Sequence, residues 1–130
     1  MRDYYYKIDL TAPPGDRQAI PHTGPFMEWA VWHESMMMAG KQICRHDRVE
    51  GYLVSTIFLA MNHDFGGEGP PILWETMVLG EGEHAGGQWR HSSEKEALGC
   101  HAAVLASLLT DLGVIDVEAV EVRPLLPETT

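Results

Sequence analysis

Two apolar runs in the middle of the chain decide its fold. Residues 52–61 read YLVSTIFLAM, residues 72–80 read ILWETMVLG, and the polar stretch NHDFGGEGPP separates them. Both runs are rich in β-branched and aromatic residues, which favour strands. The connection between them is too long for a tight turn, so we expect it to project as a loop. This stretch therefore predicts two strands of an antiparallel sheet.

Polar side chains occur within both runs, and burying such groups is costly unless they are paired. Because side chains alternate between the faces of a strand, Ser55 and Thr56 point to opposite faces, as do Glu75 and Thr76. Both faces of the first run are mostly apolar, so we expect this strand to be central and covered at least in part on both sides. The two runs are therefore the place to look for a site.

Other segments also have the character of strands or loops. Residues 4–10 and 114–122 alternate loosely between polar and apolar types, and residues 88–92 follow a glycine-rich loop, so each predicts a strand. The charged residues 41–49 predict an edge strand, because charges at a sheet edge oppose aggregation. Residues 11–25 hold four prolines and two glycines, which predicts a surface loop.

Two segments are typical of helices. The first covers about residues 26–38 and follows Pro25, a residue that suits the start of a helix. The second begins at Ser93, which can form a capping box with Glu96 three residues later. The apolar stripe of this second helix contains His101, so we expect the imidazole ring to face the sheet.

The order of these segments predicts an α+β fold, with an antiparallel sheet of about four to six strands and two main helices packed on it. A ferredoxin-like arrangement is one topology that this order allows. The length of 130 residues and the 45% hydrophobic content fit a single domain. We expect its core within about residues 26–122 and a frayed tail at residues 124–130.

The charge of the chain narrows the classes of partner. The 19 acidic residues exceed the 9 basic ones, for a net charge of −10. A basic footprint is missing, which argues against direct nucleic-acid binding. The surplus of acidic residues either keeps the protein soluble or attracts a basic partner. Such a partner could be a DNA-binding enzyme, if the acidic surface imitates DNA. No signal peptide or run of about 18 apolar residues occurs, so we expect a cytoplasmic protein that does not bind membranes. The oligomeric state stays open.

Glu75 and His101 are the leading candidates for catalysis. A core histidine can be hydrogen-bonded to a neighbouring acid, or it can act as a base or metal ligand. A buried Glu75 needs a partner, and Arg90 on the following strand is the first choice, with His101 the second. If Glu75 and His101 meet, their pKa values separate in a way that suits acid–base chemistry.

A metal site is a weaker hypothesis. His63, Glu75 and His101 form a set of two histidines and one carboxylate, although no HExxH spacing supports it. We expect no other cofactor. Cys44 and Cys100 form no CxxC pair, which excludes a zinc ribbon, and the spacing leaves both free thiols and a disulfide open.

Binding residues are expected on the first helix and on the loop. Trp29 and Trp32 are large aromatic candidates, and His63, Asp64 and Arg90 are polar ones. The three consecutive methionines at residues 36–38 fit either an adaptable binding surface or packing.

The segment VSTIFLAMNHDFGGEGPPILWETMVLG, followed by WRHSSEKEALGCH, resembles a family of small proteins from tailed bacteriophages and prophages. The resemblance covers about residues 26–104. The chain departs from the family pattern at Ala60, where glycine is usual, at Asn62, where aspartate is usual, and at Trp74 and His91, which replace other aromatics. The polar motif of the family corresponds here to Ser55, Thr56, His63, Glu75, Thr76, Arg90, Glu96 and His101.

The resemblance implies a phage origin and a role in the infected cell, and the family has no settled activity. We therefore expect a phage accessory protein that binds a basic host or phage protein, for example in counter-defence. One alternative is a small metal-dependent or acid–base enzyme centred on His63, Glu75 and His101. Another is a component of virion assembly.

Overall fold

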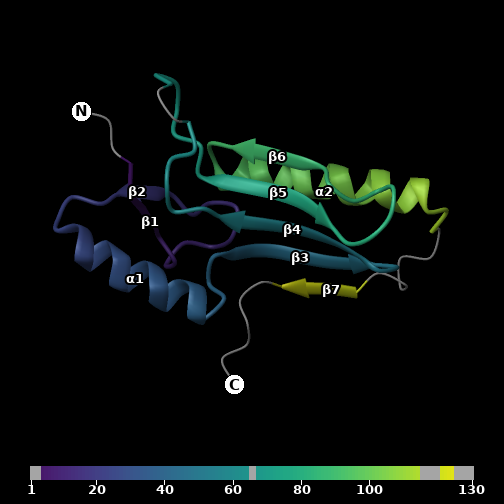
Figure 1. Ribbon diagram of the computed structural model, residues 1–130, viewed down its shortest axis with the longest axis horizontal. Coiled ribbons are helices and arrows are strands. Elements are labelled where there is room, and N and C mark those ends of the chain that lie inside the picture. Colours follow the sequence, from purple (N-terminus) through teal and green to yellow (C-terminus); the bar gives the residue numbers. More distant parts are fainter. Residues whose placement is uncertain (1–3, 65–66, 115–120, 125–130) are drawn as a thin grey trace.

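The computed structural model describes residues 4–64, 67–114 and 121–124, which form an α+β fold (Figure 1). Two antiparallel sheets and two helices make up this part of the chain, as the sequence predicts. The elements are β1 (Tyr6–Ile8), β2 (Ala19–Pro21), α1 (Phe26–Met38), β3 (Ile43–Val49), β4 (Tyr52–Phe58), β5 (Trp74–Leu79), β6 (Gln88–His91), α2 (Glu94–Asp111) and β7 (Glu121–Pro124).

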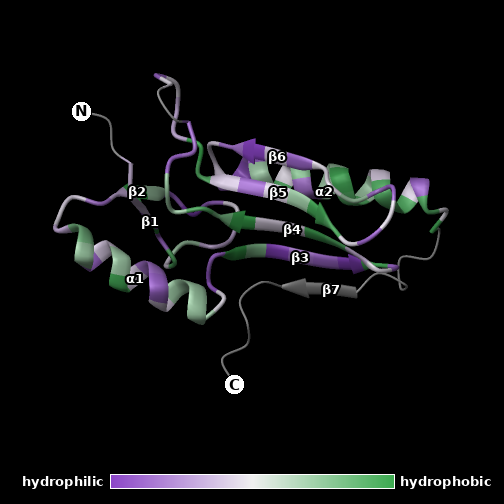
Figure 2. Cartoon of the chain, in the orientation of Figure 1, coloured by the Kyte–Doolittle hydropathy of each residue, from purple (hydrophilic) through white to green (hydrophobic). Residues whose placement is uncertain are grey.

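The larger sheet has the strand order β6-β5-β4-β3-β7, and all neighbouring strands are antiparallel. Strands β3 to β6 are neighbours in sequence and in space, so the sheet is a meander and a ferredoxin-like order is wrong. The chain then continues through α2, and β7 pairs with β3. For this reason β3 is not the edge strand that its charges predict, although Figure 2 shows how hydrophilic it is.

Two further predictions need correction. The expected surface loop at residues 11–25 contains β2, which pairs with β1 in the smaller sheet. The last predicted strand, at residues 114–122, is found slightly later as β7. Residues 115–120, and the predicted tail at 125–130, lie outside the described residues.

Helix α2 covers one face of the larger sheet, which we call the helix face. Ser93 is the predicted N-cap of α2: its hydroxyl accepts a hydrogen bond from the Glu96 backbone N–H at 3.1 Å, and the Glu96 carboxylate lies 3.2 Å from the same hydroxyl. Next to this cap, Glu94 is buried, and its carboxylate accepts three hydrogen bonds from the Arg17 guanidinium, the shortest at 2.6 Å. This ion pair attaches the segment between β1 and β2 to the start of α2.

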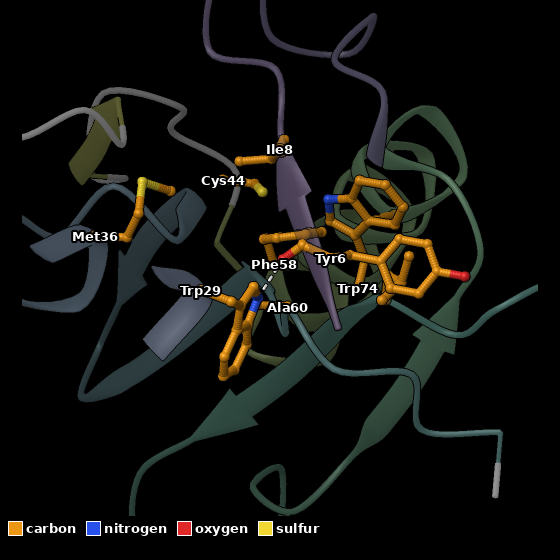
Figure 3. Close-up of a cluster of buried hydrophobic side chains, with 10 residues drawn as sticks. Tyr6, Ile8, Trp29, Met36, Cys44, Phe58, Ala60 and Trp74 are labelled. Atoms are coloured by element: carbon orange, nitrogen blue, oxygen red, sulfur yellow. Dashed lines mark hydrogen bonds between the residues drawn. The ribbon is translucent and has the colours of Figure 1, made fainter. Parts of the chain in front are cut away.

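The core consists of two apolar clusters. One joins β1 and α1 to the ends of β4 and β5, and contains Trp29, Phe58 and Trp74 (Figure 3). The other lies between the sheet and the second half of α2, and contains Val54 and Leu105. No helix in the described part of the chain is long and apolar enough to cross a membrane.

Candidate functional site

A chain of hydrogen bonds crosses the space between α2 and the sheet. The His101 ring is 2.7 Å from the Thr56 hydroxyl through Nδ1 and 2.5 Å from Asp47 Oδ2 through Nε2. The Thr56 and Thr76 hydroxyls are 2.7 Å apart. Arg45 forms an ion pair with the same Asp47 oxygen, with Nε at 2.7 Å. We call Asp47, Thr56, Thr76 and His101 the buried polar layer.

Every member of the buried polar layer is fully buried, with an exposed fraction of 0%. The prediction that His101 faces the sheet is confirmed, and its acid partner is Asp47. Burial lowers the pKa of His101, and the neighbouring Asp47 carboxylate opposes this effect. The ring is therefore neutral at pH 7.

A neutral His101 ring can make both of its hydrogen bonds in the layer when its N–H hydrogen lies on Nε2. His101 then donates to Asp47 and accepts from the Thr56 hydroxyl, which in turn accepts from Thr76. All these donors point along the chain towards the carboxylate of Asp47, so its negative charge is compensated from two sides, by His101 and by Arg45.

The Asp47 carboxylate, the His101 imidazole and the Thr56 hydroxyl are hydrogen-bonded in the same order as the groups of a catalytic triad. A nucleophile must reach its substrate, however, and the Thr56 hydroxyl is fully buried and already bonded to Thr76. This burial fits the alternative in which His101 is a core histidine hydrogen-bonded to a neighbouring acid.

Glu75 lies on the sheet face opposite to the helix face. Its Oε2 accepts hydrogen bonds from Arg90 Nε at 3.0 Å and from the Gln88 side chain at 2.8 Å. The predicted pairing with Arg90 is confirmed, whereas the proposed meeting of Glu75 and His101 is wrong. The physical reason is strand alternation: Thr76, the next residue, is the one that faces α2.

The three proposed metal ligands are not brought together. His63 lies on the loop after β4, where its Nδ1 is 2.8 Å from the Met61 carbonyl, and Glu75 and His101 lie on opposite sheet faces. Within the described residues, no three His, Cys, Asp or Glu side chains could hold a metal ion. Asp64 shares the loop with His63, and its backbone N–H donates to the Asn62 side chain at 2.9 Å.

The two predicted tryptophans on α1 differ in burial. Trp29 is 4% exposed and donates its indole N–H to the Tyr6 carbonyl at 2.8 Å (Figure 3), so it belongs to the core and its prediction as a binding residue is wrong. Trp32 is half-buried, and the ammonium of Lys7 lies 5.7 Å from its ring. Of the polar binding candidates, Arg90 is exposed beside Glu75.

The two thiols are free. Burial, more than the neighbouring Glu94, raises the pKa of Cys44, so its thiol is protonated and a poor nucleophile. Cys100 is half-buried on α2. Thiolate chemistry at Cys44 is therefore not supported by its surroundings.

The outer side of α1 is exposed and apolar over a longer stretch than the methionine run at residues 36–38 alone predicts. Met27, Val31 and Met38 are 66%, 60% and 82% exposed, and they follow one another at helical spacing. We call these three residues the docking stripe. The signal in the sequence was the apolar character of both sides of this helix, which is unusual for a helix that packs on one side only.

Comparison of the chain with family models, with curated proteins and with solved structures found no match.

Proposed function

We propose that the protein is a phage accessory protein that acts by binding a basic host or phage protein through the docking stripe of α1. The observation that carries this proposal is the exposure of three large apolar side chains on one side of one helix. Contiguous apolar surface on a folded protein commonly marks an interaction site. Methionine suits such a surface because its flexible side chain adapts to its partner.

The charge around the stripe supports a basic occupant. Residues 26–38 contain Glu28 and Glu34 and no lysine or arginine, and the whole chain carries −10. A second copy of the chain and an anionic membrane are both disfavoured as occupants, because each would bring negative charge next to negative charge. A partner segment with apolar residues flanked by lysine or arginine satisfies both the stripe and the charge.

Two structural details agree with the phage-family resemblance. Ala60, where that family has glycine, adopts a φ of 63°, a conformation that favours glycine. Asn62, where the family has aspartate, accepts backbone hydrogen bonds from Asp64 and Ile72 through its side-chain oxygen, as an aspartate also can. The local structure at residues 60 and 62 is therefore compatible both with the residues of this chain and with those usual in the family.

Photo-crosslinking tests the proposal. A benzoylphenylalanine is placed at Met38 in one protein and at Thr110, an exposed position on α2, in another, and both are expressed in infected host cells. We expect an adduct with one basic protein from position 38 and none from position 110. The combination Met27→Gln and Val31→Gln should remove that adduct, and higher salt should weaken the complex of the purified proteins.

Three outcomes would contradict the proposal: no adduct, an adduct only with a second copy of the chain, or equal adducts from both positions. An adduct with an acidic capsid or tail protein would instead favour the virion component.

A further inference from the structure

A cavity of about 370 Å³ lies between α2 and the β5–β6 hairpin. Its α2 wall runs from Cys100 to Asp111, about 16 Å along the helix axis. Val78, His84 and Trp89 form the opposite wall. The volume lies within the range of about 300–1,000 Å³ that is typical of small-molecule sites. The elements that line it, the last turns of α2 and the β5–β6 hairpin, lie at the other end of the protein from α1 (Figure 1).

One part of the cavity offers an aromatic surface. Trp89 lies on edge strand β6 and is 39% exposed, which is high for so large an apolar side chain. Gly87 allows this ring position, because a Cβ atom at residue 87 would collide with the indole. An accessible indole in a defined position is a favourable surface for an apolar or aromatic group, or for a cation.

The far end of the cavity is negative. Asp111 is exposed in the last turn of α2, where the helix dipole already places negative partial charge and where the helix has no basic residue. On the opposite wall, the His84 ring packs against Tyr52 at a centroid distance of 5.6 Å. None of the described residues that line the cavity is lysine or arginine.

Asp111 destabilises its own helix, because an acid at the C-terminal end opposes the dipole. Local rules of this kind are broken mainly at functional sites. A bound cation would remove the conflict, since it would be attracted by both the carboxylate and the helix end. The negative end and the aromatic surface thus suit two different parts of one ligand.

We infer that this cavity binds an organic cation, an ammonium group carried on an apolar or aromatic stem. The stem lies against Trp89, Val104 and Leu108, and the ammonium group lies at Asp111. Such a group can belong to a free amine or to a lysine side chain of a bound protein.

Calorimetry with three compounds of similar shape tests the inference: 4-phenylbutylamine, the neutral 4-phenylbutanol and the anionic 4-phenylbutyrate. The amine should bind up to about fivefold more tightly than the alcohol, as expected for one exposed ion pair, and the carboxylate should bind most weakly. Asp111→Asn should abolish the preference for the amine. Asp16→Asn, which removes an exposed carboxylate outside the cavity, should leave it unchanged.

A second variant keeps the inference falsifiable if the charge effect is small. Ala103 is exposed on α2 and lines the cavity, so Ala103→Phe fills the space without disturbing the core. This variant should lose at least tenfold in affinity for the amine. Equal binding of amine and alcohol to the unchanged protein would overturn the inference, and so would unchanged binding to Ala103→Phe.

A capped peptide, acetyl-Phe-Lys-amide, separates the two sources of the ammonium group. Tighter binding of the peptide than of 4-phenylbutylamine assigns the cavity to a lysine of a partner protein, and the reverse order assigns it to a free amine. Changing the docking stripe on α1 should affect neither compound, so this site and the proposed function can fail separately.

Discussion

At the scale of single residues, His101 shows how completely one side chain can depend on its surroundings. Its ring is held by an acid from β3 and a hydroxyl from β4, and no part of it reaches solvent. Removing a partner from such a network leaves buried polar groups unpaired, which costs more than the hydrogen bond itself contributes.

We therefore expect His101→Ala to lower the free energy of unfolding by about 3 kcal/mol, from the cavity it leaves and from the weakened pairing of Asp47. Urea unfolding measures this loss. His22→Ala, which removes a half-buried ring bonded to the exposed Pro25 carbonyl, is the control and should cost less than about 1 kcal/mol. Similar losses in both variants would contradict the assigned role of His101.

Acid should destabilise the protein through its histidines. Burial is the main cause that lowers the pKa of His33, His46, His91 and His101 in the folded state below the ordinary value of 6.5. The unfolded chain therefore binds more protons below about pH 6.5, and stability that is present at pH 7.5 falls as the pH decreases through that value.

Urea unfolding between pH 7.5 and pH 5 measures this dependence. Each such histidine contributes at most about 1.4 kcal/mol per pH unit to the slope. The slope should be shallower in His101→Gln. A protein that becomes more stable between pH 6.5 and pH 5.5 would show that the assignment of neutral folded-state histidines is wrong.

At the scale of elements, the buried polar layer divides the core. Thr56 lies between Phe58 of one apolar cluster and Val54 of the other, and His101 lies likewise between Ala97 and Leu105. On β3, Asp47 likewise separates residues of the first cluster from residues of the second, and on β5 Thr76 does the same. The layer therefore defines one relative position of α2 and three strands, because a shifted register would leave its members unpaired.

Replacing the whole layer tests whether it contributes specificity more than stability. In the described part of the protein, Asp47 Oδ1 is buried without a hydrogen-bond partner, so the layer itself carries a cost. The combination Asp47→Leu, Thr56→Val, Thr76→Val and His101→Leu should be within about 1 kcal/mol of the parent, or more stable. The sum of the four single losses should be much larger.

Urea unfolding of all five variants gives this comparison, and NMR line widths report whether one packing persists. If the losses simply add up, the layer contributes net stability and our interpretation of it is wrong.

At the scale of the whole molecule, the exposed side of α1 is separate from the core that holds the fold, whereas the cavity beside α2 is lined in part by the core residues Val78 and Leu108. The docking stripe is exposed on α1, whereas Trp29 and Met36 on the same helix are buried. The helix therefore has an inner side that serves stability and an outer side that is available for a partner.

Changing the stripe should leave stability intact. We expect the triple variant Met27→Gln, Val31→Gln, Met38→Gln to unfold within about 1 kcal/mol of the parent, because glutamine is a good helix former and these positions are exposed. Met36→Ala should cost about 2–5 kcal/mol. Thermal and urea unfolding measure both, and a large loss in the triple variant would place the stripe in the fold instead of in an interface.

Much of the fold follows from local signals. The span of α1, the N-cap at Ser93, and the central position of β4 were predictable because each depends on neighbouring residues and on the alternation of apolar types. The pairing of Glu75 with Arg90 was also predictable, since adjacent strands of a meander bring nearby residues into register.

The partner of His101 was not predictable from the sequence, because a β-bulge decides it. Ile43 pairs with Ile57, but Arg45 pairs with Thr56, so one extra residue shifts the register within β3. Without that shift Asp47 would point to the opposite face, since a one-residue slip exchanges the two faces of a strand. Alternation therefore determined by itself which residues share a face within each strand, and only the tertiary structure decided which faces meet, because pairing between distant segments depends on the geometry of the whole sheet.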